Sequence, residues 1–272
     1  MKAKPKAIVV IPEYNEEKTI TNVLERTYPY ADLVVVVNDG STDTSGHLVR
    51  KWAAAHPGVV LLTLARNQGM SGALLMGFTF VLQLLDRGFV DPEDVVVNID
   101  ADGQHLPEEI PVALEAMKAG GSDVLLGKRD LRGYPWFKHI GNWGLSLWAT
   151  LLSGYHYQDV ECGFRLMRVE VLADMLSYFA GRRYGCAQEI GVITARRGWR
   201  IDNRFQTNIA YYRAGARIRD GITNLRMGFM AFLRVALNRR TPLDVRYAMI
   251  SGLVVEDTLQ ERVTFRPWAA SS

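Results

Sequence analysis

The first 130 residues alternate short runs of apolar, largely β-branched residues with longer segments of helical periodicity. Runs rich in Val, Ile and Leu that end at polar residues or glycine predict buried strands over residues 7–11, 33–37, 59–64, 95–99 and 123–127. The segments between them predict helices over residues 17–27, 44–56, 71–87 and 107–119. Strands joined by helical crossovers lie parallel, so this order predicts an α/β fold whose mainly parallel sheet is covered by helices on both faces.

Composition excludes several other classes. The 272 residues are 48% hydrophobic and 22% charged, which is typical of a globular chain and excludes a disordered, collagen-like or coiled-coil one. Two cysteines, Cys162 and Cys186, are too few for a disulfide framework or a zinc site made of thiolates, and favour a reducing compartment. No run of 18 apolar residues predicts a spanning helix, and the apolar stretch near Met1 is too short for a signal peptide. We therefore expect a cytoplasmic protein.

The net charge of +3 is unevenly distributed. Residues 196–240 contain eleven arginines, no lysine and only two acidic residues, a local charge of +9 that leaves −6 for the rest of the chain. This imbalance predicts an anionic partner for the C-terminal part of the protein.

Polar residues follow three of the predicted strands directly. The clusters are Pro-Glu-Tyr-Asn-Glu at 12–16, Asn-Asp-Gly-Ser-Thr-Asp at 38–43 and Asp-Ala-Asp-Gly-Gln-His at 100–105. Because the carboxyl ends of parallel strands meet at one edge of a sheet, we expect the three clusters to converge. For any one cluster alone, the alternative is that it only makes a turn and caps a helix.

The third cluster predicts a metal site. Asp100 and Asp102 can both reach one hard divalent cation, with Gln104 as a further oxygen donor. Asp39 is placed to accept hydrogen bonds from a nucleobase or ribose. Neither a GxGxxG motif nor a P-loop follows any predicted strand, so dinucleotide-binding and ATPase sites lack their phosphate cradle. We expect Mg²⁺ or Mn²⁺ to neutralise the phosphates of the substrate instead.

Taken together and in order, these clusters resemble those of family 2 glycosyltransferases. Further matching segments are Arg-Asn-Gln-Gly at 66–69, Gly-Lys-Arg at 127–129 and Asp-Val-Glu-Cys-Gly-Phe-Arg at 159–165. The closest branch contains the dolichol-phosphate mannose synthases and bacterial polyprenyl-phosphate glucosyltransferases, and the resemblance runs from residue 7 to about residue 217. It implies a GT-A fold, a nucleotide-sugar donor, a divalent metal and inversion at the anomeric carbon.

The resemblance also implies roles for individual residues. It assigns the nucleotide-sugar pocket to Pro12, Tyr14, Glu16, Asp39, Asp100, Ala101 and Asp102, and the metal to Asp100, Asp102 and Gln104. Arg129 and Asp159 are the implied catalytic residues, Arg129 facing the acceptor phosphate and Asp159 lying closest to the attacking group. A phosphate monoester is already anionic at neutral pH, whereas an alcohol acceptor would need Asp159 to remove a proton.

Further acceptor contacts are implied for Lys138, Glu189, Arg213 and Arg217. The branch's usual Arg-Lys-Ser and Gly-x-Ser-Lys patterns are altered around Lys138 and around Arg213 and Arg217. Glu189 has the alternative of being a carboxylate on the surface of a helix.

Two amphipathic segments predict an acceptor presented by a membrane. Residues 136–152 carry Trp136, Trp143 and Trp148 among aliphatic residues, and residues 222–237 combine Phe229 and Met230 with flanking arginines. The alternatives are a core stripe for the first and a packed helix or dimer contact for the second. We thus expect a GT-A domain over 1–217, a membrane-interface segment over 218–242 and a C-terminal tail of unknown role over 243–272.

The predicted activity is transfer of a hexose from a UDP-glucose or GDP-mannose type donor to a polyprenyl phosphate, by an enzyme attached peripherally to the cytoplasmic face of the membrane. A family 2 transferase with a soluble hydroxyl acceptor and a non-catalytic nucleotide-sugar-binding module remain open. Asp-x-Asp-Gly at 100–103 also fits haloacid-dehalogenase-type phosphohydrolases, although that family expects the motif early in the domain and followed by Thr. Nucleic acid is not an expected partner; the donor base, the sugar and the oligomeric state are left open.

Overall fold

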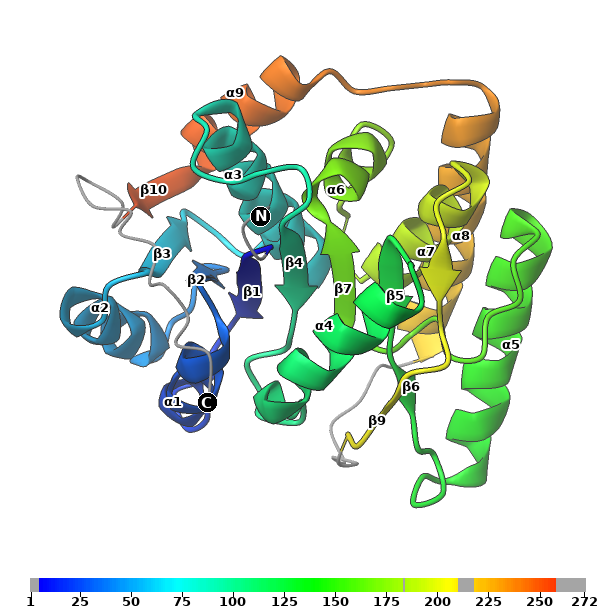
Figure 1. The fold of residues 1–272 in the computed structure, drawn as a ribbon, viewed down its shortest axis with the longest axis horizontal. Helices are drawn as coiled ribbons and strands as arrows, with labels where there is room; N and C mark the ends of the chain where they lie inside the picture. Colours follow the sequence, from blue (N-terminus) through cyan, green and yellow to red (C-terminus); the bar gives the residue numbers. More distant parts are fainter. Residues whose placement is uncertain (1–4, 183, 210–217, 258–272) are drawn as a thin grey trace.

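The computed structural model describes residues 5–182, 184–209 and 218–257, and its centre is an eight-stranded sheet (Figure 1). The strands follow the order β10-β3-β2-β1-β4-β7-β5-β8. They are β1 (Ala7–Glu13), β2 (Leu33–Asn38), β3 (Val59–Leu64), β4 (Val95–Asn98), β5 (Val124–Leu126), β7 (Arg165–Arg168), β8 (Ile201–Asp202) and β10 (Val254–Asp257). β1 pairs in parallel with β2 and β4, whereas β7 and β10 run antiparallel to their neighbours. The predicted mainly parallel α/β sheet is confirmed.

The predicted helices are present with shifted starts. They are α1 (Ile20–Thr27), α2 (Ser45–Ala55), α3 (Met70–Asp86) and α4 (Ile110–Ala119), the last preceded by the 3₁₀ turn η2 (Pro107–Glu109). The first helix begins three residues later than expected because Glu17 bonds across to the next loop. Its backbone N–H donates to Asp43 at 3.1 Å and its carboxylate accepts from the hydroxyl of Thr44 at 2.7 Å. This contact joins the loops that follow β1 and β2.

Two hydrophobic cores lie on opposite faces of the sheet. Successive side chains of a strand point to opposite faces, so Val10 of β1 packs into one core while Ile11 packs into the other. The Val10 core includes α3, α6 (Val169–Leu176) and α7 (Cys186–Arg196). The Ile11 core includes α1 and α4. The strands are buried on both faces, which explains their continuous apolar runs.

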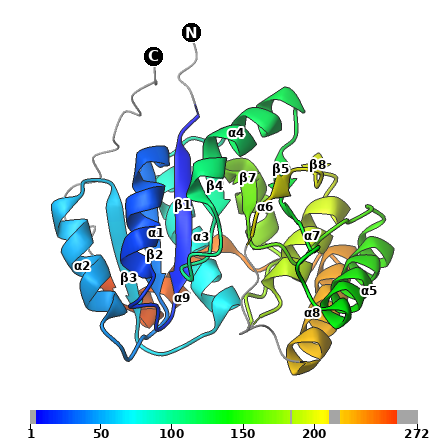
Figure 2. The ribbon, with the colours of Figure 1, turned by 90° about the horizontal axis from the view of Figure 1, so that it is seen from below.

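Two long helices, α5 (Trp136–Ser153) and α8 (Ile218–Ala236), pack side by side at one end of the molecule (Figure 2). Both also contact α7. β6 (Lys128–Arg129), which precedes α5 in the chain, pairs with β9 (Gln206–Thr207), which follows α7, in a second, two-stranded sheet. No helix of the described residues is long and apolar enough to span a bilayer.

The chain continues past α8 into the body of the fold. α9 (Leu243–Leu253) packs on α3, and β10 extends the sheet at β3. The described part of the expected tail is therefore integrated with the sheet and the helices that cover it. The predicted division of the chain at residues 217 and 242 stays a prediction.

Candidate active site

The three polar clusters converge on one cleft of about 220 Å³ at the carboxyl ends of β1, β2 and β4. Its lining contains all seven residues assigned to the nucleotide sugar, namely Pro12, Tyr14, Glu16, Asp39, Asp100, Ala101 and Asp102. Parallel strands bring their carboxyl ends to one edge, and this places residues from positions 12 to 102 around one space. Their contact with a nucleotide sugar stays a prediction.

Asp39 organises the wall of this cleft. Its carboxylate accepts hydrogen bonds from the backbone N–H groups of Gln68 at 2.6 Å and Gly69 at 2.8 Å. Burial raises the pKa of Asp39, and the two N–H donors partly offset that shift. Gly69 has φ of 80° and precedes the first residue of α3, so Asp39 fixes the turn from which this helix starts. In this structure both oxygens of Asp39 are thus bonded to the protein backbone.

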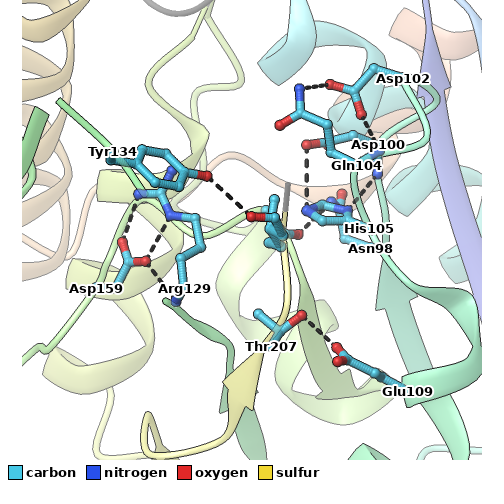
Figure 3. A network of polar contacts seen from close by, with 12 residues as sticks. Asn98, Asp100, Asp102, Gln104, His105, Glu109, Arg129, Tyr134, Asp159 and Thr207 are labelled. Atoms are coloured by element: carbon cyan, nitrogen blue, oxygen red, sulfur yellow. Dashed lines mark hydrogen bonds and ion pairs between the residues drawn. The ribbon is translucent and has the colours of Figure 1, made fainter. Parts of the chain in front are cut away.

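Asp100 and Asp102 form the acidic part of the cleft, and His105 and Gln104 are hydrogen-bonded to them (Figure 3). Asp102 accepts from the amide nitrogen of Gln104 at 2.6 Å and from the backbone N–H of the same residue at 3.0 Å. Burial and the nearby charge of Asp100 raise the pKa of Asp102. The backbone N–H of Asp100 donates to Nδ1 of His105 at 2.9 Å, so a neutral ring carries its proton on Nε2, which lies 3.7 Å from the Asp100 carboxylate.

This arrangement fits a hard divalent cation that shares its coordination with a substrate. Two carboxylates repel each other in a partly buried place, and a cation would relieve that repulsion. Within the described part of the chain, no group of three or more His, Cys, Asp and Glu side chains is arranged to hold a metal, so further oxygen ligands would have to come from elsewhere. The side-chain nitrogen of Gln104 donates to Asp102 and so orients the Asp102 carboxylate. The role of Gln104 as an oxygen ligand of the metal stays a prediction.

Arg129 and Asp159 form a second group (Figure 3). The guanidinium donates from Nε and Nη2 to the two oxygens of Asp159 at 2.7 and 2.8 Å, and the backbone N–H of Arg129 adds a third bond at 3.1 Å. Nη2 also donates to the side-chain oxygen of Asn142 on α5 at 2.9 Å. The structure thus pairs the two predicted catalytic residues and ties them to α5.

Glu161, which the sequence did not single out, connects the Asp159 loop to two helices. Its carboxylate accepts from the side-chain nitrogens of Gln188 on α7 and Asn224 on α8, each at 2.8 Å. Burial raises the pKa of Glu161. The Gln-Glu pair at 188–189 is the sequence feature that points to this region. In the structure Gln188, and not Glu189, contacts the Asp159 loop through Glu161.

Glu189 faces the protein interior and is fully buried. It accepts from the backbone N–H groups of Ala180 at 2.9 Å and Gly181 at 3.1 Å, and it forms an ion pair with Arg234 of α8. Both oxygens are occupied within the protein, so this placement does not present the carboxylate to an acceptor. The alternative of a carboxylate on the surface of a helix is therefore wrong, and contact of Glu189 with the acceptor stays a prediction.

The other predicted acceptor residues are only partly placed. Lys138 is half-buried on α5. Arg213 and Arg217 lie outside the described residues. Tyr184, 55% exposed, lines the cleft from the segment between α6 and α7, where the sequence has no periodic pattern that would have indicated it.

Comparison with known proteins identifies the family. The model for glycosyl transferase family 2 matches residues 8–241. An undecaprenyl-phosphate mannosyltransferase of Micrococcus luteus is 32% identical over 205 residues, covering 72% of this chain and 80% of the relative. A UDP-N-acetylglucosamine–dolichyl-phosphate N-acetylglucosaminyltransferase of Methanococcus voltae is 26% identical over 247 residues, covering 84% of this chain and 94% of the relative.

Solved structures agree on the fold. Glucosyl-3-phosphoglycerate synthase of Mycobacterium tuberculosis, crystallised with Mn²⁺ and UDP-glucose, superposes with a TM-score of 0.57 at 21% identity, covering 85% of this chain and 78% of that one. The phosphohydrolase alternative is thereby set aside, because the family match covers all three strand-end clusters as well as the Arg129 and Asp159 segments. The chain has the GT-A fold and belongs to glycosyl transferase family 2.

Proposed function

We propose that this protein transfers a hexose from a nucleotide-diphospho-sugar to a polyprenyl phosphate, with inversion at the anomeric carbon, while attached peripherally to the cytoplasmic face of a membrane. The observation that most directly supports a lipid acceptor is the position of Asn142 and Trp143, which are neighbours on α5. Asn142 accepts a hydrogen bond from Arg129, and Trp143 is 66% exposed. One helix thereby links the reactive group to an open apolar surface.

That surface, here called the α5 stripe, follows the helical repeat of α5. Its members are Trp136, Ile140, Trp143, Leu147 and Leu151, all exposed. Spacings of three and four residues place these side chains on one side of the helix. Ile222, Leu225 and Phe229 are exposed on the adjacent α8. Large apolar groups gathered on one surface mark an interaction site, and tryptophan suits the membrane interface.

The paired geometry of the site suits a phosphate nucleophile. Arg129 donates to both oxygens of Asp159, an arrangement that suits holding the guanidinium more than acting as a general base. A phosphate monoester is ionised before it binds and needs no such base. Asp159 would then hold Arg129 in place for the acceptor, while an alcohol acceptor would require the pair to open.

Asp100 and Asp102 would hold Mg²⁺ or Mn²⁺ together with the donor diphosphate, and the cation would neutralise charge that develops on the leaving nucleoside diphosphate. The Mycobacterium tuberculosis synthase of the same fold binds Mn²⁺ and UDP-glucose, which supports this proposal. The relatives named for undecaprenyl phosphate and dolichyl phosphate support the acceptor class.

A donor panel tests the function. Purified protein is incubated with UDP- and GDP-hexoses, Mn²⁺ and undecaprenyl phosphate, and the lipid product is identified by mass. A glycosyl phosphoprenol of the correct mass is the expected result. Product on a soluble acceptor such as a hydroxy acid, with none on the lipid, would establish the alternative transferase, and donor binding without any product would establish a binding module.

A further inference from the structure

A second, larger cleft of about 870 Å³ lies between α3, α8 and residues 179–182. Much of its wall is apolar and comes from Leu75, Met76, Phe179, Met227 and Met230. Its volume falls in the range of small-molecule sites, and methionine side chains adapt readily to irregular apolar ligands. It is distinct from the smaller cleft lined by Pro12, Asp39 and Asp100, here called the donor cleft after the nucleotide-sugar donor predicted to bind there.

Four arginines also line this cleft, and two of them are available to a ligand. Arg234 is paired with Glu189, and Arg246 donates to the backbone carbonyls of Leu176 and Phe179. Arg182 and Arg226 are exposed and make no ion pair or side-chain hydrogen bond within the described ranges. Among the described residues, the cleft therefore combines an apolar interior with two positive charges that have no acidic partner.

The cleft borders the donor site. On α3, Met70 and Ala73 line the donor cleft while Gly72 and Met76 line the larger one. Residues 179–182 and Tyr184 likewise divide between the two clefts, because Arg182 belongs to the larger cleft and Tyr184 to the donor cleft. The first turn of α3 and this short segment thus form the wall between the two spaces.

We propose that the larger cleft binds the isoprenoid chain next to the phosphate of the acceptor, with Arg182 and Arg226 supplying positive charge for the phosphate end. This assignment rests on the proposed function and adds the place where the lipid is recognised. A phosphate monoester carries close to two negative charges at neutral pH, which matches two guanidinium groups. A soluble hydroxy acid or sugar has no apolar part to fill a wall of one leucine, three methionine and one phenylalanine side chains.

Two substitutions test the cleft, each with a matched control. Met230→Trp fills it from an exposed position on α8, and Val245→Trp makes a similar enlargement at an exposed position of α9 outside the cleft. Arg226→Gln removes one of the two free charges, and Arg239→Gln makes the same charge change at an exposed residue that does not line the cleft. Circular dichroism establishes that all four variants are folded.

Binding of water-soluble prenyl phosphates is measured by calorimetry without membranes. Wild type is expected to bind farnesyl phosphate about tenfold or more tightly than dimethylallyl phosphate, because the longer chain buries more apolar surface. Met230→Trp should abolish this preference and Val245→Trp should keep it. Arg226→Gln should weaken farnesyl phosphate binding about five- to tenfold without affecting farnesol, and Arg239→Gln should have no effect on either ligand.

Equal affinity of wild type for the two phosphates would overturn the proposal, as would equal effects of Met230→Trp and Val245→Trp. Farnesol bound as tightly as farnesyl phosphate would overturn the part assigned to the arginines. The proposed function can fail independently of the cleft. Selective binding of farnesyl phosphate without glycosyl transfer from any donor would support the lipid-binding cleft and contradict the proposed transferase activity. Equal binding of farnesyl phosphate and dimethylallyl phosphate, with glycosyl transfer to both at equal kcat/KM, would support the transferase activity and contradict the lipid-binding role of the cleft.

Discussion

Arg129 and Asp159 are joined by two parallel hydrogen bonds, from Nε to Oδ2 at 2.7 Å and from Nη2 to Oδ1 at 2.8 Å. The Asp159 side chain is only 2% exposed, so solvent hardly competes for it. Such a fork fixes both the position and the plane of the guanidinium. The pair therefore favours positioning over proton transfer as the role of Asp159.

Asp159→Asn should lower kcat/KM with polyprenyl phosphate by about 10- to 100-fold, because an amide cannot hold the guanidinium through two acceptors. The acid limb of the pH profile should remain, since it would report the second ionisation of the acceptor phosphate near pH 6. The measurement is kcat against pH for both proteins. Loss of that limb, together with a fall of about 10⁴-fold, would instead identify Asp159 as a general base.

Asp102→Asn should reduce metal-dependent turnover by about a thousandfold or more, because one of the two carboxylates for the cation is lost. The thermal midpoint should not fall, since the amide removes the repulsion between Asp100 and Asp102. Activity is compared with and without chelator, and after adding Mn²⁺ back. Asp244→Asn, at an exposed position of α9, serves as control. Wild-type activity of Asp102→Asn in excess chelator would disprove metal use at this site.

Glu189→Gln should destabilise the fold by about 2 to 4 kcal/mol, because it leaves Arg234 without its buried carboxylate. The KM for the nucleotide-sugar donor should stay unchanged in the folded variant, because Glu189 does not line the smaller cleft. Urea unfolding and steady-state kinetics give the two quantities, and Glu115→Gln on the exposed side of α4 should change stability by less than about 0.5 kcal/mol. A raised acceptor KM at unchanged stability would return Glu189 to the acceptor site.

Replacing Trp143 and Leu151 of the α5 stripe by serine should weaken binding to anionic vesicles about tenfold or more, because both exposed side chains lose their apolar burial in the interface. Flotation with vesicles is the measurement, and Val112→Ser, at a position 63% exposed on α4, should leave recovery unchanged. Higher salt should weaken binding further through the arginines. Equal recovery of wild type with and without vesicles would favour a soluble acceptor.

Glu13 lines the donor cleft, and burial raises its pKa to about 7 although hydrogen bonds with Ser45 and Ser41 oppose the shift. The folded protein then binds this proton more tightly than the unfolded chain, whose glutamate has a pKa of 4.5. The free energy of unfolding should therefore fall as pH rises from 4.5 to 7, by at most about 3 kcal/mol from this group. Urea unfolding at pH 5 and pH 8 should show a smaller fall for Glu13→Gln. An equal fall in the free energy of unfolding for wild type and Glu13→Gln would refute the raised pKa of Glu13.

The sequence by itself determined the sheet, the helices that cover it and the convergence of the polar clusters. Continuous apolar runs can only be buried on both faces, and parallel strands bring residues that follow them to a common edge. Pro12, Asp39 and Asp100 can be grouped for that reason from the sequence alone, and they line one cleft. The motifs at these positions also led to the family that the comparisons confirm.

Only the tertiary structure decided which neighbour each buried polar group meets. Every residue of α7 from Cys186 to Thr194 is buried, so no apolar stripe distinguishes the direction of Gln188 from that of Glu189. Successive helical residues point about 100° apart, and this sends Gln188 to Glu161 while Glu189 meets Arg234. The pairing of β10 with β3, and the larger cleft between α3 and α8, likewise join segments about 150 or more residues apart, a relation that local periodicity does not encode.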